Sequence, residues 1–112
     1  MYLPKSDVYN ILKSINSNYY VSQTQPATFN ELPAIIFSVG NNSINTDLNN
    51  TILSQDIEIV IDIWAEDSIT ASNVLSQVEE IMRKNLYKMS YSNDVPNNGN
   101  LYHILSRFTK IV

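Results

Sequence analysis

The sequence predicts an α+β fold, in which an antiparallel β-sheet carries a short N-terminal helix and one long helix packed on one face. Two observations predict it. Residues 57–64 place isoleucine at every second position, and residues 68–86 repeat apolar side chains with a helical period. Side chains alternate between the two faces of a strand, so the isoleucines form one apolar face. The expected element order is α-β-β-β-α-β-β.

The length of 112 residues fits one domain, and we expect a single domain over residues 1–112. A chain of this size buries roughly two-thirds of the surface that it exposes when unfolded, which is enough for one modest core.

The first helix is expected over residues 4–16. Pro4 suits its first turn, where the missing N–H removes no hydrogen bond. One apolar stripe at helical spacing supports it: Val8, Ile11, Leu12 and Ile15. Residues 19–22 have the aromatic and β-branched composition of a short strand, and residues 34–39 predict a second strand that Gly40 ends.

The asparagine-rich segment 41–51 has no apolar period, so we expect a loop or a hairpin tip there. The third strand follows from Leu53 or Ser54 to Trp64. It is expected to pair antiparallel with the second strand around this loop.

The long helix is expected to begin near Asp67 or Ser68, either of which can cap its free N–H groups. Its inward stripe is predicted to be Ala71, Val74, Leu75, Val78, Ile81, Met82 and Leu86. The last segment predicts a hairpin with arms 87–92 and 101–112, joined through the turn signal of residues 97–100. One face of the second arm is predicted to carry Tyr102, Ile104, Phe108 and Val112.

The composition argues against several classes of function. The net charge is −4, and the seven lysines and arginines are scattered, which disfavours DNA binding by phosphate neutralisation. The absence of cysteine excludes a disulfide framework, a thiolate metal site and a cysteine nucleophile. No apolar stretch is long enough to cross a bilayer and no signal peptide is visible, so we expect a soluble protein without a membrane partner.

Residues and motifs that commonly carry out catalysis are scarce in this sequence. His103 is the only histidine and has no recognisable partner in the sequence, so we interpret it as structural. Glu58 and Asp62 share a strand face, but a strand that faces solvent or another subunit produces the same spacing, and no histidine accompanies them. The two glycines are isolated, which excludes a phosphate-binding loop. We therefore expect no catalytic residue, cofactor or metal, and no enzyme.

The outer face of the third strand is the strongest candidate for an interaction surface. It carries Glu58, Val60, Asp62 and Trp64. Val60 and Trp64 add more apolar surface than a monomer needs, and a small antiparallel sheet leaves two open edges. This pattern predicts a subunit that completes its burial against copies of itself. The alternative is that the first helix or a loop covers these surfaces.

A family resemblance rests on this order of elements. The short N-terminal helix is followed by the Leu32–Phe37 entry to a strand, a polar loop, and the Ile57–Ala65 strand with its acidic tail Glu66-Asp67. The long helix and a closing strand, Tyr102–Phe108, complete the pattern. In these features the chain resembles the tail terminator proteins of long-tailed bacteriophages, also called tail completion or tail-to-head joining proteins.

The resemblance implies a virion protein that is assembled in the host cytoplasm into a ring, commonly of six subunits, at the top of the tail tube. In that family the ring stops tube polymerisation and presents a surface for the filled head. The implied partners are other copies of the chain, the tail-tube protein and a head connector or neck protein. No catalytic or cofactor residues carry over.

The same resemblance makes the loop 41–51 a candidate contact with the tube or the head connector, through residues such as Asn42, Asn45 and Asp47. If Glu58, Asp62 or Asp47 line the lumen of a ring, their charge repels DNA phosphates and lets the genome pass without specific binding.

Two alternatives stay open. Another head–tail connector or neck subunit has the same order of elements. A small cytoplasmic protein-binding module that uses an open sheet edge belongs to a different class.

Overall fold

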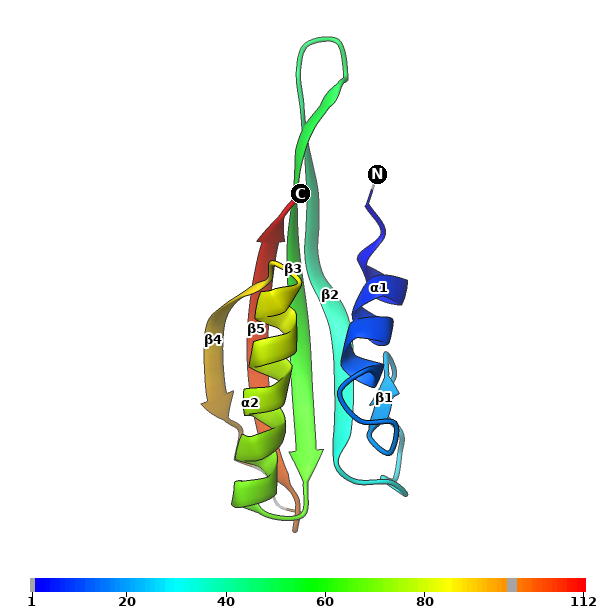
Figure 1. Ribbon diagram of the computed structural model, residues 1–112, viewed down its shortest axis with the longest axis vertical. Coiled ribbons are helices and arrows are strands. Elements are labelled where there is room, and N and C mark those ends of the chain that lie inside the picture. The colour runs from blue at the N-terminus through cyan, green and yellow to red at the C-terminus, as the bar shows by residue number, and fades with distance from the viewer. Residues whose placement is uncertain (1, 97–98) are drawn as a thin grey trace.

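The computed structural model describes residues 2–96 and 99–112, and its elements follow the predicted order. They are α1 (Pro4–Lys13), β1 (Tyr20–Ser22), β2 (Ala34–Thr46), β3 (Ile52–Ala65), α2 (Ser68–Lys84), β4 (Lys88–Asp94) and β5 (Tyr102–Ile111). The strands form one sheet in the order β1-β2-β3-β5-β4, and both helices lie on the same face of it (Figure 1). The predicted α+β class and element order are confirmed.

Strand β3 is the centre of the sheet. It pairs antiparallel with β2 on one side and with β5 on the other, so that Ile61 lies opposite both Phe37 and Ser106. Its four alternating isoleucines are at most 2% exposed and form the middle of the core beneath the helices. The predicted period of two therefore identifies the buried face of this strand correctly.

One edge of the sheet differs from the expected antiparallel arrangement. β1 pairs parallel with β2, with Tyr20 opposite Ala34 and Ser22 opposite Ile36. The connection over residues 23–33 carries the chain back to the same end before β2 begins, so both strands run in one direction. The sheet is therefore mixed.

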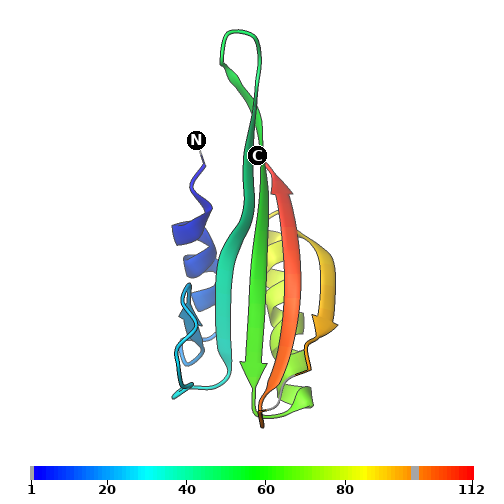
Figure 2. The same cartoon turned by 180° about the vertical axis from the view of Figure 1, so that it is seen from behind.

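Segment 41–51, expected to be a loop or a hairpin tip, forms the end of a β2–β3 hairpin, but more than half of it is strand. The prediction that Gly40 ends the second strand is wrong, because β2 continues through Thr46. Its outer half pairs with the first half of β3, which leaves residues 47–51 as the turn. The resulting hairpin extends beyond the other strands and gives a molecule of 53 × 27 × 24 Å (Figure 2). Cross-strand pairing with β3 outweighs the low strand propensity of asparagine here.

The helices follow the prediction with two corrections. α1 ends at Lys13, three residues before the expected end at residue 16. Asp67 caps α2 as predicted, but Leu86 does not belong to its inward stripe. Leu86 lies past the end of the helix with a φ of 69° and is 78% exposed.

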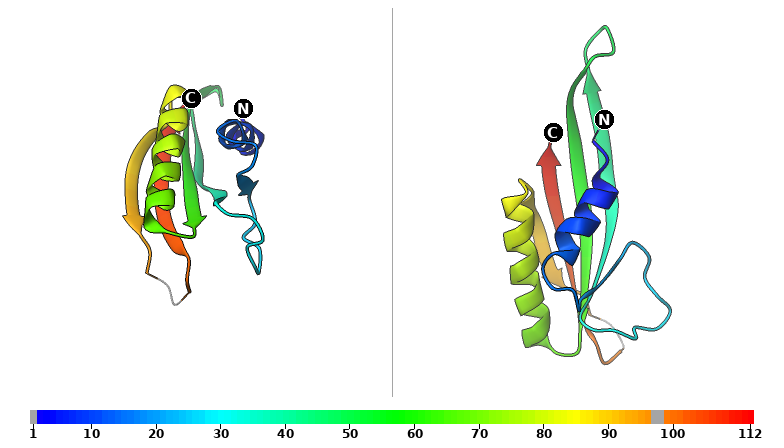
Figure 3. Two further views of the ribbon diagram at one scale, coloured as in Figure 1. Left: turned by 60° about the horizontal axis from the view of Figure 1, so that its bottom comes forward. Right: turned by 45° about the vertical axis from the view of Figure 1, so that its right-hand side comes forward.

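The C-terminal hairpin forms as predicted, with β4 and β5 antiparallel. Ile104 and Phe108 are buried, whereas Tyr102, at the start of the strand, and Val112, just past its end, are about half exposed. The predicted turn includes Asn97 and Asn98, which lie outside the described residues. The right-hand view of Figure 3 shows the β2–β3 hairpin extending beyond both helices.

Candidate functional site

The face of the sheet opposite the helices is the first part of the candidate site. The register places the alternating residues of β3 opposite β5: Glu58 faces Thr109, Val60 faces Arg107, Asp62 faces Leu105 and Trp64 faces His103. The four β3 residues are neither fully buried nor fully exposed. The structure therefore brings together four of the seven predicted interface residues on one helix-free surface.

One ion pair and one hydrogen bond cross this face diagonally. Arg107 donates from Nη1 to Glu58 Oε1 at 2.9 Å, and His103 Nε2 lies 2.6 Å from Asp62 Oδ1. Diagonal neighbours on adjacent strands are within reach of long side chains. Each carboxylate thus has a cross-strand partner, and the partly exposed Arg107–Glu58 ion pair contributes about 0.2–1 kcal/mol of stability. Arg107 offsets one of the two carboxylate charges on this face.

The partner of His103 could not be seen in the sequence. Asp62 is 41 residues away, and only the pairing of β3 with β5 brings it to the ring. A carboxylate can fix the tautomer of an imidazole. Within the described part of the chain, no hydroxyl or thiol is hydrogen-bonded to this ring, and the described residues contain no group of three or more metal-binding side chains.

Aromatic side chains close one end of the helix-free face. The Trp64 indole stacks on the His103 imidazole at 3.9 Å between ring centroids, and Phe29 packs on the indole at 5.2 Å. Phe29 comes from the connection between β1 and β2, so a loop covers this end of the face. The expectation that Trp64 presents surplus apolar surface is therefore only partly right, because the chain itself buries much of the indole.

The Trp64 side chain retains one unsatisfied polar atom. Its Nε1 is buried and has no hydrogen-bond partner among the described residues. Leaving such a donor unpaired costs about 1–3 kcal/mol.

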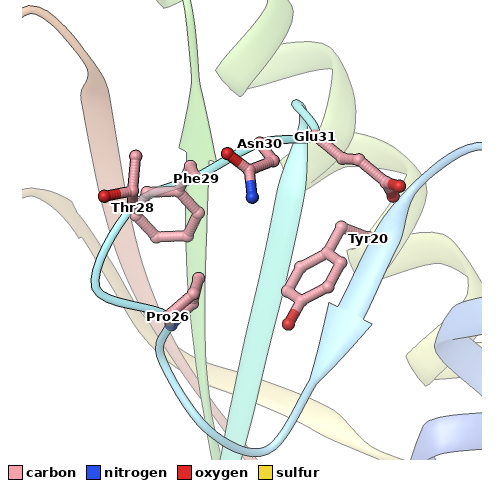
Figure 4. Close-up of a pocket in the computed structure, with 6 residues that line it drawn as sticks. All are labelled: Tyr20, Pro26, Thr28, Phe29, Asn30 and Glu31. Atoms are coloured by element: carbon pink, nitrogen blue, oxygen red, sulfur yellow. The ribbon is translucent and has the colours of Figure 1, made fainter.

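A small pocket lies beside this aromatic cluster. It has a volume of about 140 Å³ and is lined by Tyr20, Pro26, Thr28, Phe29, Asn30 and Glu31 (Figure 4). This volume is below the range typical of sites for small organic ligands. The pocket therefore gives no support to a cofactor site.

The β2–β3 hairpin is the second part of the candidate site, and its polar residues hold the hairpin together. Asn42 Oδ1 accepts from Gln55, and Asn45 Nδ2 donates to Ser54 Oγ at 2.8 Å. Asp47 Oδ1 accepts from the backbone N–H groups of residues 49 and 51. The three predicted contact residues of this segment thus have structural partners.

Sequence reasoning missed the apolar side chains of the hairpin. Four of them are between 40% and 104% exposed: Ile44, Leu48, Ile52 and Leu53. The sequence did contain a signal for them: single aliphatic residues recur in and just after the polar segment 41–51. A loop that contacts nothing does not need such residues.

A polar cluster fastens the N-terminal segment at the base of the hairpin. The Tyr2 hydroxyl donates to Asp7 and lies 3.4 Å from the Tyr87 hydroxyl, and the Lys110 ammonium lies 5.0 Å from both ring centroids. Burial raises the pKa of Tyr2 and of Tyr87 above the ordinary value, and the hydrogen bond to Asp7 raises that of Tyr2 further. Both hydroxyls therefore stay neutral in the folded protein at physiological pH.

Comparison with known proteins does not assign the chain to a family. No protein-family model matches the chain, and no curated protein matches it significantly. Neither described helix has both the length and the apolar character needed to cross a membrane.

Proposed function

We propose that this chain is a structural subunit of a bacteriophage virion, a ring-forming tail terminator that caps the tail tube and presents the docking surface for the head. One observation carries the proposal: both helices cover the same face of an elongated sheet, and the opposite face is free of helices. The family resemblance of the sequence supports the same role.

The surface available is large enough for a ring. A standard protein interface buries about 800 Å² on each partner. Two such interfaces, one to each neighbour, would occupy roughly a quarter of the 6803 Å² of accessible surface. A heterologous contact that closes by rotation gives a ring, and one that does not close gives a filament.

Passage of DNA through such a ring would depend on paired charges. Arg107 is paired with Glu58, so it is not free to bind phosphate with full strength. If this face lines the lumen, this pairing reduces attraction of the genome, and the net charge of −4 opposes binding further. This modifies the expectation that Glu58 and Asp62 repel DNA phosphates, since each of them has a cross-strand partner.

The proposal is tested with purified protein and polymerising tail-tube protein of the same phage. We expect a hexamer in solution, or a monomer that assembles only on tube ends. Added protein should shorten the tubes and appear as a ring at one end in electron micrographs. Analytical ultracentrifugation gives the mass of the assembly.

Two outcomes contradict the tail-terminator role. A ring that ignores tube ends but binds a head connector identifies another neck subunit. A stable monomer that leaves tube growth unchanged favours a small protein-binding module, for which the outer edge of β4 offers a strand to pair with.

A further inference from the structure

Exposed apolar side chains gather at the hairpin end of the molecule. Among the described residues, seven of the twelve exposed large apolar side chains lie on the hairpin or at its base: Leu3, Ile44, Leu48, Ile52, Leu53, Ile111 and Val112. The terminal segments reach this place because the backbone groups of Tyr2 bond the Gln55 side chain and those of Val112 bond the Gln55 backbone. Scattered apolar residues need no explanation, but a cluster of this kind marks a contact surface.

The tip of the hairpin presents one leucine in a fixed turn. Leu48 is fully exposed, while Asp47 Oδ1 accepts hydrogen bonds from the N–H groups of Asn49 at 2.8 Å and of Thr51 at 2.9 Å. The Asn50 N–H also donates to the Asp47 carbonyl. A turn that is already ordered loses little conformational entropy when its leucine is buried by a partner.

A hollow that can receive this leucine lies near the start of α1. It has a volume of about 530 Å³ and is lined by Leu3, Pro4, Lys5, Ser6, Val39 and Asn42. The tip of the same chain lies at the far end of the hairpin, well away from the start of α1 (Figure 1). An apolar knob and an apolar hollow thus occur on different surfaces of one chain.

We propose that Leu48 of one copy seats in this hollow of a second copy, with the Asp47 carboxylate next to Lys5. The opposite charges of the tip and the hollow favour a second copy as the occupant. A membrane surface is disfavoured because the hairpin, residues 41–56, carries two aspartates and no lysine or arginine.

This contact deepens the proposed function, on which it rests. Because the tip and the hollow are different surfaces, the contact is heterologous and joins copies head to tail, which closes into a ring if the rotation returns to the start. The hairpin is then the arm by which each subunit holds the next one.

Cross-linking tests the contact directly, since the chain contains no cysteine. An Asn49→Cys variant, which keeps Leu48 and replaces only an exposed neighbouring side chain, is mixed with an isotopically labelled Ser6→Cys variant. The mixture is treated with a short thiol cross-linker, with tail tubes present if the protein alone is monomeric. Mass spectrometry distinguishes mixed pairs from pairs of one variant. The matched control replaces Ser6→Cys by Ile69→Cys, an exposed position on α2 away from the hollow. We expect mixed pairs with Ser6→Cys at several times the control yield.

Association strength gives the second measurement. Leu48→Asp should weaken self-association roughly tenfold or more, because it places a charge in an apolar hollow, whereas Ile69→Asp should leave association unchanged. Melting curves verify that both variants fold.

The outcomes separate this inference from the proposed function. Mixed pairs no more abundant than the control, or an unchanged association of Leu48→Asp, overturns the contact whether or not the wild-type protein caps tubes. Cross-linked pairs that assemble only as a closed dimer support the contact and contradict the ring.

Discussion

At the scale of single residues, Gln55 organises more of the structure than its place in a strand suggests. Its side chain is 3% exposed, and its amide reproduces the hydrogen bonding of a backbone unit. Nε2 donates to the Tyr2 carbonyl at 2.8 Å and to Asn42 Oδ1 at 2.7 Å, and Oε1 accepts from the Tyr2 N–H. One side chain therefore joins the N-terminal segment to both arms of the hairpin.

We expect Gln55→Leu to reduce the free energy of unfolding by about 1–3 kcal/mol, because it leaves partly buried polar groups of Tyr2 and Asn42 without partners. Urea denaturation measures the change. Asn45→Ala is the matched control, since the contacts of Asn45 are exposed and should contribute less than about 0.5 kcal/mol. Equal stability of Gln55→Leu and the wild type would show that this amide is dispensable.

Leu86 has a left-handed backbone conformation, which is unfavourable for a residue with a Cβ atom. It follows α2 at the position where a left-handed residue closes the helix, with its N–H donating to the Arg83 carbonyl and that of Tyr87 to the Met82 carbonyl. Glycine is the residue usually found at this position, because it has no Cβ to clash.

Leu86→Gly should raise the free energy of unfolding by about 1 kcal/mol, since the strain is relieved and little buried surface is lost. Leu86→Ala removes the same exposed side chain but keeps the Cβ, so it should bring no gain. Thermal and urea unfolding of the two variants decide the matter. If both variants were more stable than the wild type, the cause would be the loss of the exposed apolar side chain and not the relief of backbone strain.

At the scale of elements, the Asp67 cap of α2 makes the stability of the fold depend on pH. The Asp67 carboxylate accepts a hydrogen bond from the Thr70 N–H at 2.7 Å, and this bond, helped by the Thr70 hydroxyl, lowers the pKa of Asp67. A folded-state pKa below the unfolded value means that the stabilisation is present above the ordinary pKa of about 4 and is lost as the pH falls through the folded value.

Asp67→Ala should therefore lower Tm by several degrees at pH 7, and the difference from the wild type should shrink as the pH falls from about 5 toward 2. Circular dichroism melting curves across this range measure it. Glu66→Ala, at an exposed neighbouring carboxylate, should leave Tm at pH 7 nearly unchanged. A difference between Asp67→Ala and the wild type that stays constant with pH would remove the carboxylate from the explanation.

Periodic patterns made most elements predictable, whereas contacts between distant segments did not. The alternating isoleucines identified β3 and its buried face, and Asp67 identified the start of α2. The outer part of β2 was missed because its asparagines become strand only by pairing with β3. The His103–Asp62 pair and the cover of Phe29 on Trp64 depend on register and loop path, which no local pattern carries.

At the scale of the whole molecule, the core and the hairpin are separate parts of one sheet. The buried cluster includes β3 only from Ile57 and β2 only up to Phe37, with Val39 at its margin. Beyond this point the hairpin residues are exposed except for Gln55 and the half-buried Ser54 and Asp56. The stability of the fold should therefore depend little on the tip, while the assembly of copies should depend on it strongly.

Shortening the hairpin tests this separation. Replacing residues 45–54 by Asn-Gly joins Ile44 to Gln55, which already lie opposite each other, through a turn that favours tight hairpins. The free energy of unfolding should change by less than about 1 kcal/mol, because no core contact is removed and closing a shorter loop costs less entropy. Self-association should be weakened to a similar extent as in Leu48→Asp at full length.

Urea denaturation and ultracentrifugation of the shortened chain, beside the full-length Leu48→Asp variant, separate stability from assembly. Both variants should be as stable as the wild type and similarly weak in association, because each lacks the leucine at the tip. A shortened chain that unfolds without cooperativity would mean that the hairpin arms belong to the folding core. A shortened chain that associates normally would instead assign the contact to the helix-free face, where Val60 and Leu105 lie between the Arg107–Glu58 and His103–Asp62 contacts.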